Sequence, residues 1–390
     1  MELILVNNRS DEKRFNEVNA LLNRSNPVYI RPLDNEVNDV FNEHKNKHFK
    51  YGETRRWIAL DDSGNLIGRI AAFTNSKYIN KGTDFKTGGM GFFDSVNDQS
   101  VANALFDVAK EWLLSKGMEA MDGPINFGDR DKWWGLMVEG FASEPMYGMS
   151  FNPSYYENLF TVYGFENYYN QYYYSMNVDD PLPARFPERH AKFKAKPGYE
   201  AKHVRLNELE KYAGDFATVY NAAWAQHGEA KEITKEQVIK LFQKMKPIMD
   251  ERTVWFAYYK EDPIAMFINI PDLNQYFKHF DGKFGWLEKL RLVWMKLRGV
   301  NKRLTGLAFG VVPKYQALGI DSFMIYECAL LLQGKGWYTQ YEMGWAGDWN
   351  PKMINIYRSL GGVQSRRMVT FRYLFNRERT FERHPEMAYK

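Results

Sequence analysis

The feature that most constrains this chain is a pattern that occurs twice. Trp57 and Trp255 lie 198 positions apart, and each opens an apolar run, a polar turn and a second apolar run. That arrangement is typical of a β-hairpin. Asn152 and Asn350 are also 198 positions apart, and each precedes a proline, apolar residues at helical spacing and a glycine. Two anchors at one offset predict a tandem duplication of one α/β unit.

The segments between the hairpin and the Asn-Pro helix also agree in the two copies. Each is predicted to contain a strand, a helix ending in Lys-Gly and a second strand, at residues 87–96, 101–117 and 118–125, then 304–312, 321–336 and 337–345. A strand–helix–strand step is a parallel crossover, whereas a hairpin is antiparallel. We therefore expect two α/β domains, each with a mixed, mostly antiparallel sheet flanked by helices.

The boundary between the copies follows from proline content. Four prolines interrupt regular structure close to the end of the first copy, namely Pro181, Pro183, Pro187 and Pro197. We predict a first domain over residues 1–180, a Pro-rich connection over 181–199 and a second domain over 200–390.

Charge and cysteine content exclude several classes of function. The 52 basic and 48 acidic residues give a net charge of +4, which is too balanced for a DNA-binding protein. The lone cysteine, Cys328, allows neither an internal disulfide nor a cysteine-based metal site. The apolar runs are shorter than the ~20 residues of a membrane helix, and the start lacks an export-signal pattern. We expect a cytoplasmic protein without a transmembrane segment.

One loop in the second copy has the pattern of a ligand site. An apolar strand ending in Val-Val-Pro is followed by the run Gln-Ala-Leu-Gly-Ile-Asp at 316–321 and then by an apolar helix. A glycine at such a turn lets the backbone approach a ligand closely, and amides at a helix start bind pyrophosphate. Asp321 is a suitable N-cap for that helix. The first-copy loop, residues 96–103, has no glycine and carries Asp98, so we expect binding in the second copy alone.

The loop resembles the acyl-CoA-binding loop of the GNAT acyltransferase superfamily. It matches the superfamily pattern at Gln316 and Gly319 and departs from it at Asp321, where a small residue is usual. The order of elements in both copies is similar to GNAT, and tandem pairs occur among Fem-type aminoacyltransferases and N-myristoyltransferases. The resemblance implies two tandem GNAT-like domains, acetyl-CoA or another acyl-CoA as co-substrate, no metal, and coenzyme contacts from Val311, Val312, Gln316, Ala317, Leu318, Gly319, Ile320, Asp321 and Asn350.

Acyl transfer to an amine also needs groups that handle charge and protons. Amides of a distorted strand over residues 307–311, with Gly310 permitting the distortion, would stabilise the oxyanion. The resemblance places the proton donor to the leaving thiolate at Tyr357. Glu342 and Asp348 are the candidate bases. The alternatives are that Tyr357 is a packing residue and that both carboxylates are solvated.

Three other features of the sequence have patterns that suggest a role. The insertion over residues 123–135, with Arg130, Asp131 and Trp134, is expected to line an acceptor pocket or to pack between the halves. His44 and His48 are four positions apart, but no third metal ligand accompanies them. A basic segment over residues 272–303 carries an apolar helical stripe, which predicts a helix covering the core rather than a membrane-surface helix.

The sequence therefore predicts an acyl-CoA-dependent N-acyltransferase, most simply an N-acetyltransferase, acting on a small-molecule or peptide amine. One alternative is a Fem-like aminoacyl transferase, which would use aminoacyl-tRNA. The other is a non-catalytic tandem domain that binds acyl-CoA. The pattern does not predict an oligomeric state.

Overall fold

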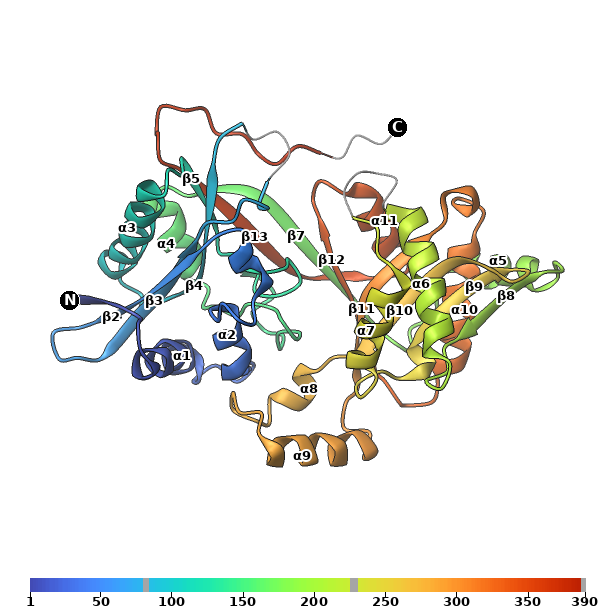
Figure 1. Ribbon diagram of the computed structural model, residues 1–390. Coiled ribbons are helices and arrows are strands. Elements are labelled where there is room, and N and C mark those ends of the chain that lie inside the picture. Colours follow the sequence, from blue (N-terminus) through green and yellow to red (C-terminus); the bar gives the residue numbers. More distant parts are fainter. Residues whose placement is uncertain (80–83, 225–230, 387–390) are drawn as a thin grey trace.

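A single continuous sheet runs through the whole computed structural model, which describes residues 1–79, 84–224 and 231–386 (Figure 1). Among these residues the sheet has 13 strands. The first half contributes β1 (Glu2–Leu5), β2 (Thr54–Leu60), β3 (Leu66–Phe73), β4 (Thr87–Ser95), β5 (Ala120–Gly123), β6 (Leu136–Glu139) and β7 (Glu166–Asn177). The second contributes β8 (Tyr199–His203), β9 (Val254–Tyr259), β10 (Asp262–Pro271), β11 (Arg303–Val311), β12 (Gln340–Gly347) and β13 (Val363–Leu374).

The helices follow the same order in both halves, which confirms the duplication. Those of the first half are α1 (Arg9–Asn23), α2 (Asp34–Val40), α3 (Gln99–Ser115) and α4 (Tyr156–Tyr163). Their counterparts in the second half are α6 (Leu209–Trp224), α7 (Lys235–Met245), α10 (Ile320–Leu332) and α11 (Pro351–Ser359). The second half adds α5 (Arg185–Lys194), α8 (Asn274–Phe277) and α9 (Trp286–Leu297). The predicted fold class is confirmed, because β4 and β5, like β11 and β12, pair in parallel while the hairpins are antiparallel.

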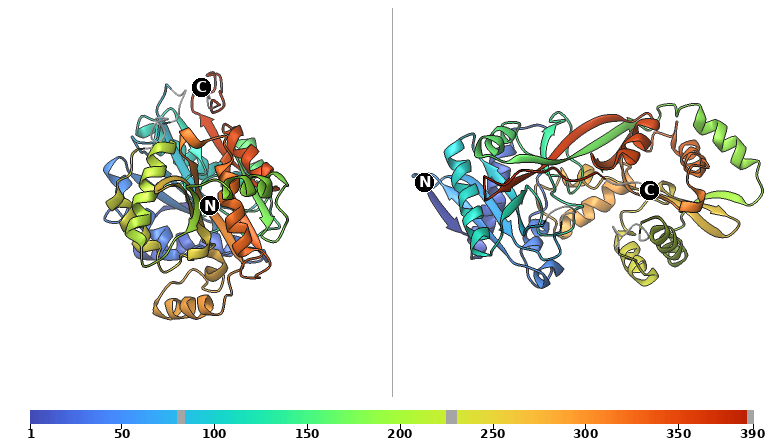
Figure 2. Two further views of the ribbon diagram at one scale, coloured as in Figure 1. Left: turned by 90° about the vertical axis from the view of Figure 1, so that its right-hand side faces the viewer. Right: turned by 90° about the horizontal axis from the view of Figure 1, so that it is seen from above.

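The two halves exchange their last strands. The sheet order is β1-β2-β3-β4-β5-β13-β7-β12-β11-β10-β9-β8, and the remaining strand, β6, pairs with β13 beside this path. Strand β13 therefore pairs with β5 of the first half, and β7 pairs with β12 of the second. The long strands β7 and β13 pair with each other and cross the middle of the molecule, as both views show (Figures 1 and 2). The connection over 181–199 separates the halves along the chain, but each half of the sheet contains a strand of the other.

The connection itself contains a helix that proline content did not predict. Helix α5 includes Pro187 within its first turn, where a missing N–H costs no intrahelical hydrogen bond. Phe186 and Phe193 bury their rings in the second-half core beside α10. The connection is thus a packed part of the second half.

Asn152 does not begin a helix as its partner does. Asn350 caps α11 by accepting a hydrogen bond from the Met353 amide at 3.1 Å. The Asn152 side chain instead bonds the amide and carbonyl of Met137 at 2.8 and 3.0 Å, and α4 starts only at Tyr156. The repeated Asn-Pro pair therefore has different local roles in the two halves.

Candidate functional site

Strands β11 and β12 separate shortly after they begin to pair. Their pairing covers Arg303–Thr305 against Gln340–Glu342. Beyond it, β12 has a bulge at Gly344, whose φ of +81° suits a residue without a Cβ. In the described part of the chain, the residues of β11 after Thr305 therefore have no pairing with β12, and this edge of β11 is open.

The open edge of β11 presents backbone hydrogen-bonding groups. The Val312 amide donates to the Ile264 carbonyl of β10 at 2.9 Å. Because successive residues of a strand point their backbone groups to opposite sides, Phe309 and Val311 direct theirs toward β12. This edge has the donors that an oxyanion or an amide-containing ligand requires.

The distortion of β11 lies elsewhere than at the predicted Gly310. The register against β10 shifts around Leu307, which has no partner between Ala308 and Gly306. The glycine at position 310 is explained by packing instead, because a Cβ there would lie 3.1 Å from the ring of Trp224. Gly310 therefore permits close packing by α6, not the bulge.

The hydroxyls of Tyr341 and Tyr357, here called the tyrosine centre, both lie near the point where the strands separate. The Tyr357 hydroxyl lies 3.5 Å from the Trp345 carbonyl, and a Cβ on Gly344 would be 3.7 Å from it. A Cβ on Gly306 would lie 2.9 Å from the Tyr341 hydroxyl. Burial raises the pKa of both tyrosines well above the usual range, so both remain protonated donors at neutral pH. The sequence interpretation identified Tyr357 but missed Tyr341, because a chain rich in tyrosine gives it no distinguishing signal.

Glu342 is buried and paired, not solvated as the alternative interpretation had it. Arg366 donates to its carboxylate at 3.0 Å, and Gln340 donates at 3.1 Å. Tyr173 lies within electrostatic reach of this pair. Burial raises the pKa of Tyr173, Arg366 opposes the rise and Glu342 adds to it. Tyr173 also adds to the rise in the pKa of Tyr357.

Asp348 follows the end of β12 and faces a different set of groups. Its carboxylate accepts hydrogen bonds from the Asn170 side chain at 2.7 Å and from Arg383 at 2.5 Å. These contacts fix β7 and the C-terminal segment. The structure gives Asp348 no contact with Tyr357 or Glu342 among the described interactions.

The loop after β11 has two residues in the left-handed region. Ala317 has a φ of +60° and Gly319 a φ of +97°, and α10 begins directly after at Ile320. Gln316 closes the loop by donating to the Val311 carbonyl at 3.1 Å. Such turns expose successive amides, and the helix start adds its positive dipole end. The loop therefore has the backbone geometry of known anion-binding turns.

Asp321 is not the N-cap that the sequence predicted. Gly319 holds the N-cap position, and Asp321 is the second residue of α10. No side chain caps this helix. The free amides at its start stay available to a ligand.

Arg189 brings a positive charge to the same loop. Its side chain lies 2.9 Å from where a Cβ of Gly319 would be, and its guanidinium donates to the Ser322 hydroxyl at 3.2 Å. The sequence interpretation missed Arg189, since it stands in the connection far upstream. No local pattern joins it to Gly319.

The equivalent split in the first half is filled by its own chain. Pairing of β4 with β5 ends at Gly89 and Asp122. The Ile125 amide then donates to the Met90 carbonyl at 2.7 Å and covers the edge of β4. The helix start is also occupied, because Asp98 accepts from the Ser100 amide at 2.8 Å and caps α3.

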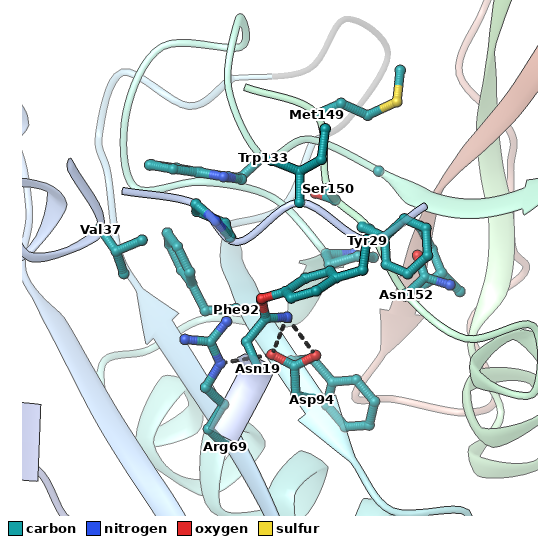
Figure 3. A pocket seen from close by; sticks show the side chains of 17 residues that line it. Asn19, Tyr29, Val37, Arg69, Phe92, Asp94, Trp133, Met149, Ser150 and Asn152 are labelled. Carbon is teal, nitrogen blue, oxygen red and sulfur yellow. Dashed lines mark hydrogen bonds and ion pairs between the residues drawn. The ribbon is translucent and has the colours of Figure 1, made fainter. Parts of the chain in front are cut away.

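A pocket in the first half contains a buried ion pair (Figure 3). Arg69 donates to Asp94 at 2.7 Å, and the Asn19 amide donates to the same carboxylate at 3.0 Å. Trp133 and Gly135 of the predicted acceptor insertion line this pocket.

The three insertion residues that were singled out lie apart from that pocket. Trp134 is buried and donates to the Tyr169 hydroxyl at 2.6 Å. The Arg130 guanidinium lies over the rings of Trp134 and Trp349, at 5.2 and 5.7 Å from their centroids. Asp131 is exposed. Arg130 thus packs between the halves, in agreement with the second expectation, whereas Trp134 belongs to a core cluster of the first half.

An apolar pocket lies between α10 and the sheet of the second half. Phe267, Leu304 and Tyr341 line its sheet side, and Ile325, Cys328 and Leu332 line its helix side. Because Tyr341 also borders the split between β11 and β12, the pocket adjoins the tyrosine centre.

Within residues 1–79, 84–224 and 231–386 no three His, Cys, Asp or Glu side chains gather closely enough to hold a metal ion. His48 instead contacts Asp129 at 3.2 Å. Over the same ranges no helix has the length and apolar character to cross a bilayer.

Comparison with known proteins gives a curated relative in sequence and solved structures of similar fold. No family model matches the chain. A bacterial ceramide synthase from Caulobacter vibrioides is 25% identical over 93% of this chain and 94% of its own. A tandem GNAT protein from the clavulanic acid biosynthesis pathway superposes with a TM-score of 0.55 at 11% identity, covering 96% of this chain and 98% of that one.

A GCN5-related glucosamine N-acetyltransferase region of a fungal multi-domain β-N-acetylglucosaminidase also has a TM-score of 0.55, at 12% identity. It covers 95% of this chain, which spans 38% of that larger protein. Together with the repeated element order, these superpositions show that the chain has the tandem GNAT fold.

Proposed function

We propose that this chain is an acyl-CoA-dependent N-acyltransferase whose donor site lies in the second half. The observation that carries the proposal is the separation of β11 from β12. Tyr357 lies at the point where the two strands separate, which we call the vertex, and the Gly319 loop lies at the start of α10. The split offers backbone groups to a pantetheine arm, and the loop offers amides and Arg189 to a pyrophosphate. The filled split and capped helix of the first half support a single coenzyme site.

The groups at the vertex supply the proton transfers of acyl transfer. The amine nitrogen attacks the thioester carbonyl, the carbon–sulfur bond breaks, and the thiolate receives a proton from Tyr357. Backbone amides of β11 stabilise the oxyanion. Of the two predicted bases, we assign the amine proton to Glu342, because it is the last β12 residue that pairs with β11 before the strands separate. Asp348 is occupied by Asn170 and Arg383.

We further propose that both substrates are lipids. A ceramide is the amide of a fatty acid and a long-chain amino alcohol, and a protein named for making it is similar to this chain over nearly its whole length. The apolar pocket beside Tyr341 supports a long acyl chain, because most of its lining is hydrocarbon, with polar atoms from Asn269, Gln333, Cys328 and Tyr341. An acetyl group would leave that pocket unused.

The proposal is tested with the full chain and detergent-dispersed long-chain amino alcohols. Release of free coenzyme A thiol is followed with a thiol reagent, and the amide is identified by mass spectrometry. Palmitoyl-CoA is expected to react faster than acetyl-CoA. Absence of thiol release with any acyl-CoA would contradict an acyltransferase. Binding of acyl-CoA without release would support the non-catalytic alternative, and transfer from aminoacyl-tRNA would support the Fem-like one.

Gly319→Val should weaken coenzyme binding about tenfold or more, because its branched side chain would collide with Arg189 and displace that cation from the loop. The measurement is the dissociation constant of acyl-CoA by calorimetry. Gly334→Val is the matched control, since Gly334 also has a positive φ, +71°, but lies beyond the other end of α10 with open space around it. Both variants carry a similar backbone strain of about 1–2 kcal/mol. Equal affinities in the two variants would remove the loop from the coenzyme site.

A further inference from the structure

The apolar stripe of α9 faces solvent, contrary to the prediction that it covers the core. Its six members are between 55% and 83% exposed: Trp286, Leu287, Leu290, Val293, Trp294 and Leu297. At 3.6 residues per turn they share one face of roughly a third of the circumference. The sequence pattern correctly placed them together, but it did not say which face of the helix meets the protein. A continuous exposed patch of this kind marks an interaction surface.

The opposite face holds α9 firmly on the protein. Met295 is buried, and Leu292 packs beside it in an aromatic cluster that includes Phe277 and Phe280. Lys296 donates to the Pro247 carbonyl at 2.6 Å. Figures 1 and 2 show α9 at the periphery, beyond α8, with its outer side away from the sheet. The stripe is therefore presented by an anchored helix.

Basic side chains border the stripe along both of its sides. At helical spacing, Arg291 and Arg298 follow one edge, and Lys289 and Lys296 follow the other. All four are exposed. The carboxylate of Glu288, the acidic residue of the helix, accepts a hydrogen bond from the Gly285 amide at 2.7 Å. The patch is thus apolar in the middle, with tryptophans within it and positive charge around it.

We propose that α9 docks this protein onto the surface of an anionic lipid bilayer. Apolar residues of an amphipathic helix enter the boundary between headgroups and acyl chains, tryptophan prefers that boundary, and lysine and arginine at the rim bind anionic headgroups. A second copy of the chain is a poorer occupant, since two-fold pairing of the same face would bring the basic rims together. The proposal rests on this surface alone and does not require the proposed activity.

The experiment is co-sedimentation of the full chain with vesicles of phosphatidylcholine, with and without one-third phosphatidylglycerol. Wild type is expected to bind the anionic vesicles and to be released by high salt. The double variant Leu290→Ser/Val293→Ser should partition about tenfold less or more, because two apolar side chains no longer enter the bilayer. Leu114→Ser is the matched control, since Leu114 is an exposed leucine on α3 of the first half, 49% exposed, and should bind as wild type does.

A second variant separates charge from apolar insertion. Lys289→Ala/Arg298→Ala should lose most of the preference for anionic vesicles while keeping the apolar stripe. Thermal unfolding of each variant, and its turnover of detergent-dispersed substrate where the wild type shows activity, report on folding and on catalysis separately from docking. If the wild-type protein does not co-sediment with anionic vesicles, the proposal is overturned. A wild-type dimer that becomes monomeric in the stripe variant would overturn it in favour of a second copy.

Discussion

Tyr357→Phe should lower turnover about 100-fold while leaving acyl-CoA affinity nearly unchanged, as expected for a lost general acid. The variant keeps the buried ring that packs against Tyr174 at 5.5 Å and removes only the hydroxyl at the split. Single-turnover kinetics with a saturating amine measure the chemical step, and calorimetry measures coenzyme affinity. A fall in turnover with unchanged affinity distinguishes a catalytic group from a binding one.

Tyr174→Phe is the matched control. Its hydroxyl is a neighbour in the same core but accepts a hydrogen bond from Arg358 at 3.2 Å, away from the split. It should retain wild-type turnover. Since burial raises the pKa of Tyr357, the wild-type rate should not fall between pH 7 and 9 through loss of that proton. Wild-type turnover in Tyr357→Phe would show that Tyr357 is a packing residue.

The fold was predictable wherever neighbouring segments decide it. Hairpins and strand–helix–strand steps depend on short-range alternation and turns, so the repeat at Trp57 and Trp255 was enough to place them. The exchange of β7 and β13 was not predictable. Each of these strands would satisfy its hydrogen bonds beside either half, and side chains far apart in sequence, such as Asp122 and Arg372 at 2.6 Å, select the arrangement.

The residues of the candidate site also fall into those that local sequence predicts and those that it does not. Gly319 and Tyr357 follow from local spacing after a strand and within a helix. Arg189 and Tyr173 come from other parts of the chain, so no spacing rule connects them to the site. Asp321 shows a further limit: its residue type suits an N-cap, but the left-handed residue Gly319 takes that position two residues earlier in the chain.

Arg366→Met should destabilise the fold by about 3–5 kcal/mol, because it leaves the fully buried Glu342 without its cation. The two residues stand on β13 and β12, with β7 between them in the sheet. Their ion pair therefore spans an exchanged strand. Urea unfolding followed by circular dichroism measures the change. Arg367→Met is the matched control at the next position, where the partner Glu139 is half exposed and the loss should stay within about 1 kcal/mol.

Variants of the Arg366–Glu342 ion pair also distinguish a structural role of Glu342 from a catalytic one. If its charge serves only the ion pair, Glu342→Gln should lower stability, while the folded enzyme keeps its turnover and its pH dependence. If Glu342 also receives the amine proton, turnover of the folded variant should fall well beyond what its stability explains, and the acidic limb of the pH profile should disappear. Arg366→Met/Glu342→Gln completes the cycle, since removing both charges should recover part of the stability lost by removing Arg366 alone. Recovery of stability without recovery of turnover would assign Glu342 to both roles.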